Sequence, residues 1–387
     1  MTHLKPIHSQ IETIMRDQGQ TRLLSPAMLL LLLSGVYGAA VRLRASFYER
    51  GLWTPRRLPC KVISVGNLTV GGTGKTPMVR YLARLIQDLG RRVAIVSRGY
   101  KGGAEKSGGI VSDGKRILMG AGEAGDEPYM LASGLTDVPV AVGRNRFAAA
   151  MQLHQACNPE VILLDDGFQH LALARDLDVV LLDHCRPFGN NHLLPRGTLR
   201  EPPAALKRGH VYIITRSNRP GGPDWDRLVK RLPGRPVLQA STRPVIDKVV
   251  SARRGPAAPD GSPRMNTIAR LNAQRVFLFS GLADNRDFRR TVREAGSVIV
   301  GALSYSDHYT YTDHDLIRIA GAAVAGEADQ IVTTAKDYAR IATQTQWPLD
   351  LVVVDVETDI QQDRETLVRI IKNCLAPGPA KPGGLSP

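Results

Sequence analysis

From Lys61 onward, short hydrophobic runs alternate with amphipathic stretches along the chain. Six runs rich in Val, Ile and Leu precede residue 217, and they span 61–67, 92–99, 138–143, 160–167, 177–183 and 211–216. Continuous apolar runs of this length, bounded by Gly, Asp or Asn, are typical of strands buried on both faces of a parallel sheet. The windows 78–90 and 144–157 between them carry helical spacing. The pattern predicts an α/β fold with a doubly wound, mostly parallel sheet over residues 61–216.

The pattern breaks after Arg216. Residues 217–264 contain eight prolines and many arginines, which predicts a linker or irregular connection. Regular apolar runs then resume at 275–285, 297–305, 330–337 and 351–357. They predict a second, smaller α/β domain over 265–375, and the Pro/Gly-rich residues 376–387 are expected to be a disordered tail.

The N-terminal stretch 23–41 contains no charged residue and is flanked by arginines on both sides. As a helix it would reach roughly 28 Å, slightly less than the hydrocarbon core of a bilayer. Four interpretations are open: a cleaved signal peptide, a membrane span, a helix lying in the membrane interface, and a helix packed on the protein itself. Pro26 and the arginines at both ends disfavour a span. We expect residues 1–60 to associate with a membrane, with an interfacial helix favoured over a spanning one.

Charge narrows the choice of partners. The chain of 387 residues has 51 Lys and Arg against 36 Asp and Glu, a net charge of +15. A positive balance favours nucleic acid, anionic lipid surfaces or phosphorylated substrates. Aromatic residues are only 5% and are not interleaved with the basic ones, so we expect no nucleic-acid partner. The four cysteines lie far apart, which predicts a reducing compartment and neither a disulfide framework nor a zinc site.

A glycine-rich loop, GNLTVGGTGKTP at 66–77, follows the first predicted strand. In a P-loop, backbone N–H groups and the next helix N-terminus bind phosphates, a lysine contacts the β- and γ-phosphates, and a hydroxyl binds Mg²⁺. Thr69 stands where the usual spacing requires glycine, but Lys75 and Thr76 are intact. Alone, the loop is as consistent with an ordinary strand-to-helix turn. The expected ATP-binding residues are Thr69, Val70, Gly71, Gly72, Thr73, Gly74, Lys75 and Thr76.

A second motif, VILLDDG at 161–167, is an apolar strand that ends in two carboxylates, the form of a Walker B motif. Asp165 or Asp166 would bind Mg²⁺ with Thr76, directly or through water. The alternative is an acidic turn after a buried strand. Because both motifs occur in order about ninety residues apart, we predict a site for ATP and Mg²⁺.

Phosphoryl transfer also requires a group that accepts the acceptor's proton. The loop has no second lysine near its start and no N-K-x-D base reader follows, which favours a kinase-like transfer over a regulatory ATPase or GTPase. Asp126, on a Gly-rich loop that opens a predicted helix, is either a catalytic carboxylate or a helix cap, and the sequence alone favours the cap. His308 in the second domain is a further candidate, although single histidines are usually structural.

Nine motifs occur in one order along the chain: GNLTVGGTGKTP, SRGYKG, GDEPYMLA, VGRNRFAAA, LDDGFQH, LLPRGTLREP, FSGLADNRDF, SDHYTYT and TTAKD. Together they closely resemble the tetraacyldisaccharide 4'-kinases of lipid A biosynthesis, over about residues 20–357. That family carries Ser or Thr at the position of Thr69.

The resemblance implies ATP-dependent phosphorylation of the 4'-hydroxyl of a tetraacyl glucosamine disaccharide 1-phosphate, which forms lipid IVA. It implies the lipid-linked disaccharide and the inner-membrane surface as partners. The enzyme would work on the cytoplasmic face of the bacterial inner membrane, held there by a monotopic or single N-terminal helix. Residues 61–216 would be the P-loop kinase domain.

The resemblance also implies residue roles. Asp126 becomes the catalytic base, in place of a helix cap, and His308 assists it. Four residues are placed near substrate or phosphates: Arg146, Gln169, His170 and Arg200. The alternative function is a membrane-associated regulatory P-loop NTPase without a phosphoryl acceptor. A nucleic-acid-dependent ATPase, suggested by charge alone, is a third.

Overall fold

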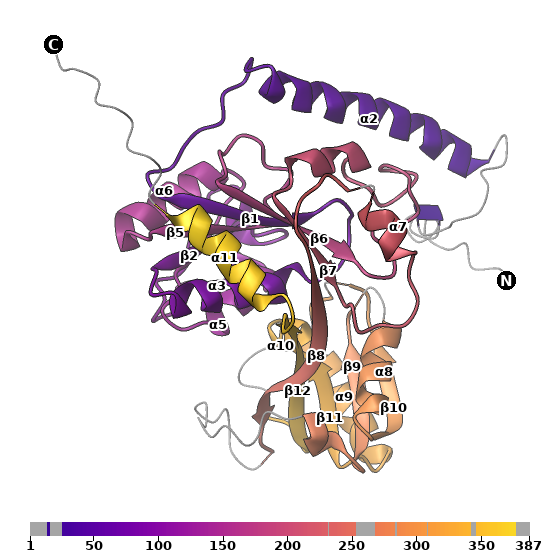
Figure 1. Ribbon diagram of the computed structural model, residues 1–387. Helices are drawn as coiled ribbons and strands as arrows, with labels where there is room; N and C mark the ends of the chain where they lie inside the picture. The colour runs from indigo at the N-terminus through magenta and orange to yellow at the C-terminus, as the bar shows by residue number, and fades with distance from the viewer. Residues whose placement is uncertain are drawn as a thin grey trace.

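The strands form one sheet that runs through the whole molecule (Figure 1). The computed structural model describes residues 14–15, 25–230, 232–252, 268–282, 285–307, 309–341 and 346–376. Within them, the 12-stranded sheet has the order β10-β9-β11-β12-β8-β7-β6-β1-β5-β2-β4-β3. The strands are β1 Lys61–Asn67, β2 Val93–Ser97, β3 Gly109–Ser112, β4 Val140–Val142, β5 Val161–Asp165, β6 Leu177–Asp183, β7 Val211–Thr215, β8 Val237–Val250, β9 Arg275–Ser280, β10 Val298–Ser304, β11 Gln330–Thr334 and β12 Asp350–Asp359.

Neighbouring strands are parallel except in the pairs β3–β4 and β8–β12. The predicted doubly wound, mostly parallel α/β sheet is therefore confirmed. The helices are α2 Pro26–Glu49, α3 Lys75–Asp88, α4 Ala121–Ala124, α5 Asp126–Ser133, α6 Arg146–Cys157, α7 Trp225–Val229, α8 Asn285–Glu294, α9 Asp313–Ala325, α10 Ala335–Tyr338 and α11 Arg364–Leu375, with short 3-10 helices at Gly103–Glu105, Pro203–Arg208 and Ile268–Leu271.

Two lobes share this sheet, and each has helices on both faces. In the first lobe, strands β1–β7 pack α3, α5 and α11 against one face and α6 against the other. In the second lobe, strands β9–β12 pack α9 and α10 on one face and α8 on the other. The last helix returns to the first lobe, where Leu367 and Ile371 are fully buried.

One expectation was wrong. Residues 217–264, expected to be irregular, contain α7 and the 14-residue strand β8. β8 is parallel to β7 and antiparallel to β12, so it joins the strands of the two lobes. It escaped prediction because Pro244, which pairs with Val356, interrupts its sequence, and proline argues against a strand inside a sheet. Of the predicted tail 376–387, residues 377–387 lie outside the described residues, and the domain boundaries stay predictions.

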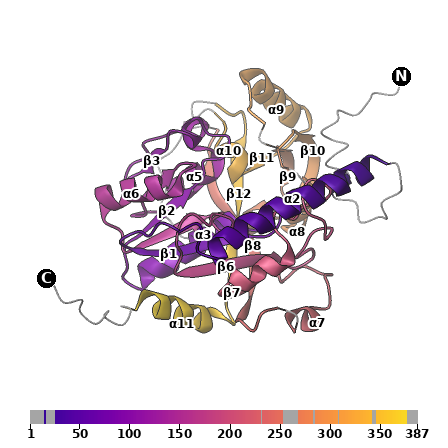
Figure 2. The ribbon, with the colours of Figure 1, turned by 90° about the horizontal axis from the view of Figure 1, so that it is seen from above.

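The helix α2 lies across the top of the molecule, over the end of the first lobe (Figures 1 and 2). It contacts the protein through small and polar residues. Ser34 and Gly38 are buried, and the Ser34 hydroxyl lies 2.9 Å from the carbonyl oxygen of Leu193. The Tyr37 hydroxyl donates a 2.8 Å hydrogen bond to the carbonyl of Arg200. Hydrogen bonds therefore fix the middle of α2 to the loop 193–200.

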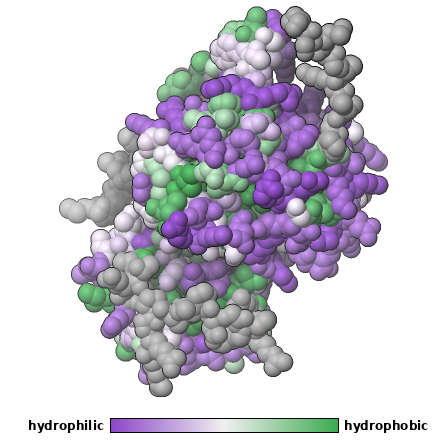
Figure 3. All heavy atoms as spheres, turned by 90° about the vertical axis from the view of Figure 1, so that its left-hand side faces the viewer, coloured by the Kyte–Doolittle hydropathy of each residue, from purple (hydrophilic) through white to green (hydrophobic). Residues whose placement is uncertain are grey.

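Five large apolar side chains of α2 are exposed, whereas Met28, Leu30, Leu31 and Val41 are half-buried. Within the described residues, α2 is long and apolar enough to cross a membrane by length and composition, and 11% of its apolar window is buried. This largely exposed surface argues against the interpretation of α2 as a core helix. Elsewhere, Figure 3 shows a mostly hydrophilic face on which hydrophobic residues form small separate patches. The exposed apolar residues of α2 are Leu29, Leu32, Leu33, Val36 and Leu43.

Candidate nucleotide and acceptor site

The glycine-rich loop connects β1 to α3, as the sequence predicts. Asn67 ends the strand and Lys75 begins the helix. Gly71 and Gly74 have φ of 110° and 80°, a region that side chains other than glycine rarely adopt. Gly74 precedes α3 without a side-chain cap, so the positive end of the helix dipole lies at the loop. The loop therefore has the backbone form and the electrostatics of a phosphate-binding site.

Thr69 has a structural reason to replace glycine. It forms an antiparallel bridge with Leu199, and the side-chain amide of Asn67 donates to its carbonyl at 2.8 Å and its hydroxyl at 3.2 Å. Thr69 is not among the residues with positive φ, so its backbone does not require glycine. The next residue continues the contact, because Val70 N–H donates to the Thr198 carbonyl at 2.7 Å. The loop 193–200 thus supports the start of the P-loop.

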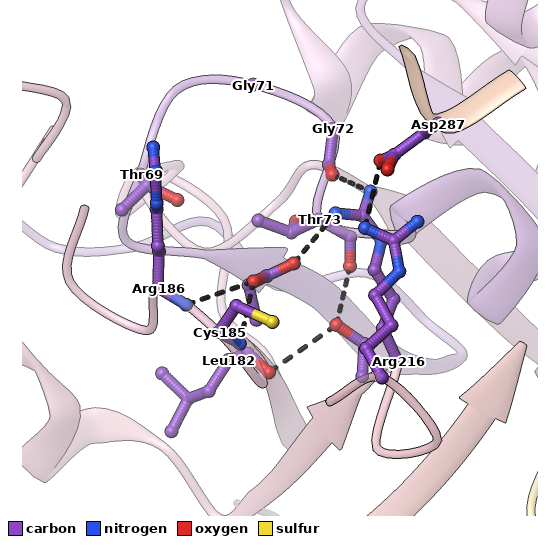
Figure 4. A network of polar contacts seen from close by, with 12 residues as sticks. Thr69, Gly71, Gly72, Thr73, Leu182, Cys185, Arg186, Arg216 and Asp287 are labelled. Carbon is purple, nitrogen blue, oxygen red and sulfur yellow. Dashed lines mark hydrogen bonds and ion pairs between the residues drawn. The ribbon is translucent and has the colours of Figure 1, made fainter. Parts of the chain in front are cut away.

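The other side of the P-loop is held by the end of β7 (Figure 4). The Thr215 hydroxyl donates to the Thr73 carbonyl at 3.0 Å. Arg216 donates to the Gly72 carbonyl and forms a 2.8 Å ion pair with Asp183 at the end of β6. These contacts fix two carbonyl groups of the loop. Sequence reasoning missed Arg216 and Asp183, because neither belongs to a motif that marks a P-loop.

The two predicted carboxylates lie beside the loop. β1 and β5 run in parallel with Val65 opposite Asp165, so the residues after them meet at the same edge of the sheet. Asp165 is buried and accepts a 2.9 Å hydrogen bond from the hydroxyl of Ser97. Asp166 lies 3.8 Å from the ammonium of Lys75 and 2.6 Å from the guanidinium of Arg200. The structure therefore brings Lys75, Asp165, Asp166 and Arg200 together.

The two carboxylates differ in their electrostatics. Burial, Glu127 and Asp166 raise the pKa of Asp165 to about 7. Burial also acts to raise the pKa of Asp166, but the nearby cations Lys75 and Arg200 outweigh it and hold that pKa below its ordinary value. A further cation at Asp165 would relieve the repulsion between these acids.

The residues fit a magnesium ion. One oxygen each of Asp165 and Asp166 and the hydroxyl of Thr73 are buried without a hydrogen-bond partner. Mg²⁺ prefers such oxygen ligands together with substrate phosphates. Thr76, the second residue of α3, carries the other predicted hydroxyl ligand. The described part of the chain has no cluster of three or more His, Cys, Asp or Glu that would hold a metal by itself, as expected for an ion that also binds the nucleotide.

The remaining predicted residues of the first lobe surround these carboxylates. Gln169 donates to the Asn67 carbonyl at 2.9 Å and accepts from Arg200 at 3.4 Å. Arg146 begins α6 and is buried, and its pKa is lowered by burial and by Arg98 although Asp166 and Asp165 oppose the shift. Burial and Arg146 lower the pKa of His170 to about 4, so this imidazole is neutral at pH 7.

Asp126 is not a helix cap in this structure. It is the first residue of α5, whose N-cap is Gly125 without a side-chain cap. Its carboxylate instead forms a 2.5 Å ion pair with Arg340 of the second lobe. His308 lies outside the described residues, and its neighbour Asp307 pairs with Lys336 at 2.8 Å. Sequence reasoning missed Arg340, for which the only signal was its place three residues after Asp337.

The loop between β1 and α3, with the carboxylates at the end of β5, defines a P-loop protein that binds a nucleoside triphosphate. The family model for tetraacyldisaccharide-1-P 4'-kinase matches residues 26–376. The chain belongs to this family.

Related proteins are similar over most of their length. A tetraacyldisaccharide 4'-kinase from Desulfatibacillum aliphaticivorans is 38% identical over 360 residues, 93% of this chain and 96% of that protein. One from Geobacter metallireducens is 40% identical over 313 residues, 81% and 88% of the two chains. The crystal structure of LpxK from Aquifex aeolicus in complex with ATP superposes with a TM-score of 0.72 at 30% identity, and the match covers 91% of this chain and all (100%) of that one.

Proposed function

We propose that this chain transfers the γ-phosphate of ATP to the 4'-hydroxyl of a tetraacyl glucosamine disaccharide 1-phosphate, forming lipid IVA. The family match over residues 26–376 carries this proposal. The site supports it, because the Asp166 carboxylate at the P-loop lies 3.8 Å from the ammonium of Lys75 and 2.6 Å from the guanidinium of Arg200.

In this reaction the acceptor oxygen forms a bond to the γ-phosphorus, and the bond from that phosphorus to the β–γ bridging oxygen breaks. ADP leaves with the bond's electron pair, and the hydroxyl proton passes to Asp126, assisted by His308. Lys75 and Arg200 stabilise the charge that develops on the transferred phosphoryl group. Mg²⁺, held by Thr76 and by Asp165 or Asp166, would neutralise charge on the phosphates.

The same proposal assigns the substrate-facing side of the site. Arg146 and Arg200 suit anionic groups of the nucleotide or of the lipid, because guanidinium binds phosphate through parallel hydrogen bonds. Gln169 accepts a hydrogen bond from Arg200, and Arg146 is close enough to His170 to lower its pKa, which supports a role for both near substrate or phosphates.

The enzyme would act on the cytoplasmic face of the bacterial inner membrane. The exposed apolar side of α2 supports this, since burying five such side chains in lipid would contribute roughly 5–10 kcal/mol. Arginines of α2 and of the segment after it would meet anionic headgroups. Nucleic acid is not among the expected partners.

The decisive experiment is a transfer assay with purified protein, ATP, Mg²⁺ and the disaccharide 1-phosphate lipid in detergent. Wild-type protein should form the 4'-phosphorylated product, and ATP turnover should depend on the lipid. Asp126→Asn should bind ATP normally but lose about 10²–10⁴-fold in turnover, the usual contribution of a general base. Near-normal transfer by this variant would remove Asp126 from the mechanism. An ATP hydrolysis rate that does not depend on the lipid would instead favour a regulatory NTPase.

Membrane association is tested separately by vesicle flotation. A variant with Leu29, Leu32, Leu33 and Val36 changed to Ser should lose vesicle binding while keeping activity on detergent-solubilised lipid. Continued binding of this variant to the vesicles would contradict the assignment of α2 as the anchor.

A further inference from the structure

The short helix α10 and the residues after it meet the proposed base from the opposite lobe. α10 packs against α5, which Asp126 begins. The guanidinium of Arg340 lies 2.5 Å from the Asp126 carboxylate, and its side chain is only 6% exposed. An arginine this deeply buried must be matched by acids, and an ion pair in such surroundings is little weakened by solvent.

The other side of Arg340 is fixed by a second carboxylate. Arg340 lies 3.5 Å from Asp337, whose side chain is 0% exposed. Asp337 itself accepts hydrogen bonds from the Gly281 N–H at 2.9 Å and the Tyr311 hydroxyl at 3.0 Å. It also accepts from the Thr334 hydroxyl at 2.6 Å. The core of the second lobe therefore fixes Asp337, the carboxylate that faces the second side of Arg340.

Three charged groups thus form a chain from one lobe to the other, in the order Asp126, Arg340 and Asp337. We infer that Arg340 is a positioning residue for the phosphoryl transfer, which holds the carboxylate of Asp126 in its ionised form and at a fixed place relative to the second lobe. This inference rests on the proposed role of Asp126 as the base. Arg340 contacts Asp126 and Asp337, and in this inference it acts on the reaction through Asp126.

Electrostatics agree with the geometry. Burial acts to lower the pKa of Arg340, but Asp126, Asp337 and Asp307 outweigh it and raise that pKa, so the guanidinium stays charged. A neighbouring cation favours the charged form of a carboxylate. The other charged group beside Asp126 on its own helix is Glu127. Without Arg340, the pKa of Asp126 should rise.

The test compares Arg340→Met and Arg340→Lys with wild type in the lipid transfer assay. Arg340→Met should lower kcat by about 10²-fold, the effect of a small misplacement of a catalytic group, with the KM for ATP changed less than about twofold. The acidic limb of its pH profile should move to higher pH, because the base now protonates more readily. Arg340→Lys keeps the positive charge but lacks the planar guanidinium group, and its kcat should be about tenfold higher than that of Arg340→Met. Arg318→Met, an exposed arginine of the same lobe, is the matched control and should behave as wild type.

Three outcomes overturn the inference: an unchanged kcat in Arg340→Met, an unmoved acidic limb, or a loss that Arg340→Lys does not recover. If Arg340→Met fails to fold, Arg340→Lys alone decides through its pH limb and kcat. Asp126→Asn separates this inference from the proposed function. If Asp126 is the base, adding Arg340→Met to Asp126→Asn should cause no further loss of kcat. If Asp126→Asn turns over normally, the proposed base is wrong whatever Arg340 does.

Discussion

Two ion pairs connect the P-loop helix α3 to strand β12, and they differ strongly in burial. Arg80 lies 2.5 Å from Asp355, and the two side chains are 10% and 12% exposed. One turn later, Arg84 lies 3.3 Å from Glu357, and these side chains are 52% and 27% exposed. Removing one partner of a buried pair leaves an uncompensated charge, which costs about 3–5 kcal/mol, whereas an exposed pair contributes about 0–1 kcal/mol.

We therefore expect Arg80→Leu to lower the free energy of unfolding by about 3 kcal/mol or more. Arg84→Leu should lower it by less than about 1 kcal/mol, also because Glu357 retains Arg243 at 3.1 Å. In the double variant Arg80→Leu/Asp355→Leu no buried charge is left unpaired, so most of the loss should be recovered.

Urea unfolding measures these differences. Trp347 is 5% exposed and stacks on Phe279 in the second lobe. In a background with Trp53 and Trp225 changed to Phe, its fluorescence reports the packing that β12 supports. Circular dichroism provides a second probe of the same transition. Equal losses in Arg80→Leu and Arg84→Leu, or a double variant no better than Arg80→Leu, would refute the reasoning that burial sets the cost.

Three further predictions concern the first lobe. Gly66→Ala should lower the free energy of unfolding by about 1–3 kcal/mol, because the added Cβ would lie 2.6 Å from the Cβ of Phe168. Gly35→Ala is the control and should not destabilise the protein, because no atom lies within 4 Å of its added Cβ. Equal thermal midpoints for the two variants would contradict this prediction. The pKa of His170 in the folded protein, about 4, lies below the ordinary 6.5, so this buried imidazole contributes stability that is present above pH 6.5 and is lost as the pH falls towards 4. His170→Gln should reduce the slope of the unfolding free energy against pH by up to about 1.4 kcal/mol per pH unit, measured by urea titrations at several pH values. An unchanged slope would be evidence against this role of His170. Tyr37→Phe removes the hydrogen bond from α2 to the loop 193–200. The value of kcat/KM in detergent should therefore fall by up to about fivefold, the equivalent of about 1 kcal/mol, while vesicle binding stays as in wild type. A loss of vesicle binding in this variant would count against a role of the hydrogen bond in the site.

The strands of the sheet were predictable because most are buried on both faces and read as continuous apolar runs. The four-residue strand β3, which begins at Gly109, was not predicted. β8 was not predicted either, since its outward residues are polar and Pro244 interrupts it. Its place is determined by pairing with β7 and β12, which are distant in sequence.

The site shows the same division. Lys75, Asp165 and Asp166 belong to motifs in which neighbouring residues share one task, so their spacing reveals them. Arg216 and Arg340 do not, because each acts on a partner 144 or 214 residues away. A single arginine leaves no local pattern, and only the folded chain shows what it contacts.

The helix α2 contacts the protein through the buried residues Ser34 and Gly38 and exposes five large apolar side chains. If α2 holds the enzyme at a membrane as proposed, the enzyme would meet its lipid acceptor by diffusion in two dimensions. Confinement to one thin layer raises the effective concentration of the two partners without any new contact between them. The reaction rate would then depend on the number of acceptor molecules per area of membrane. Diluting the acceptor with inert lipid should slow the enzyme even when the total amount of acceptor in the assay is constant.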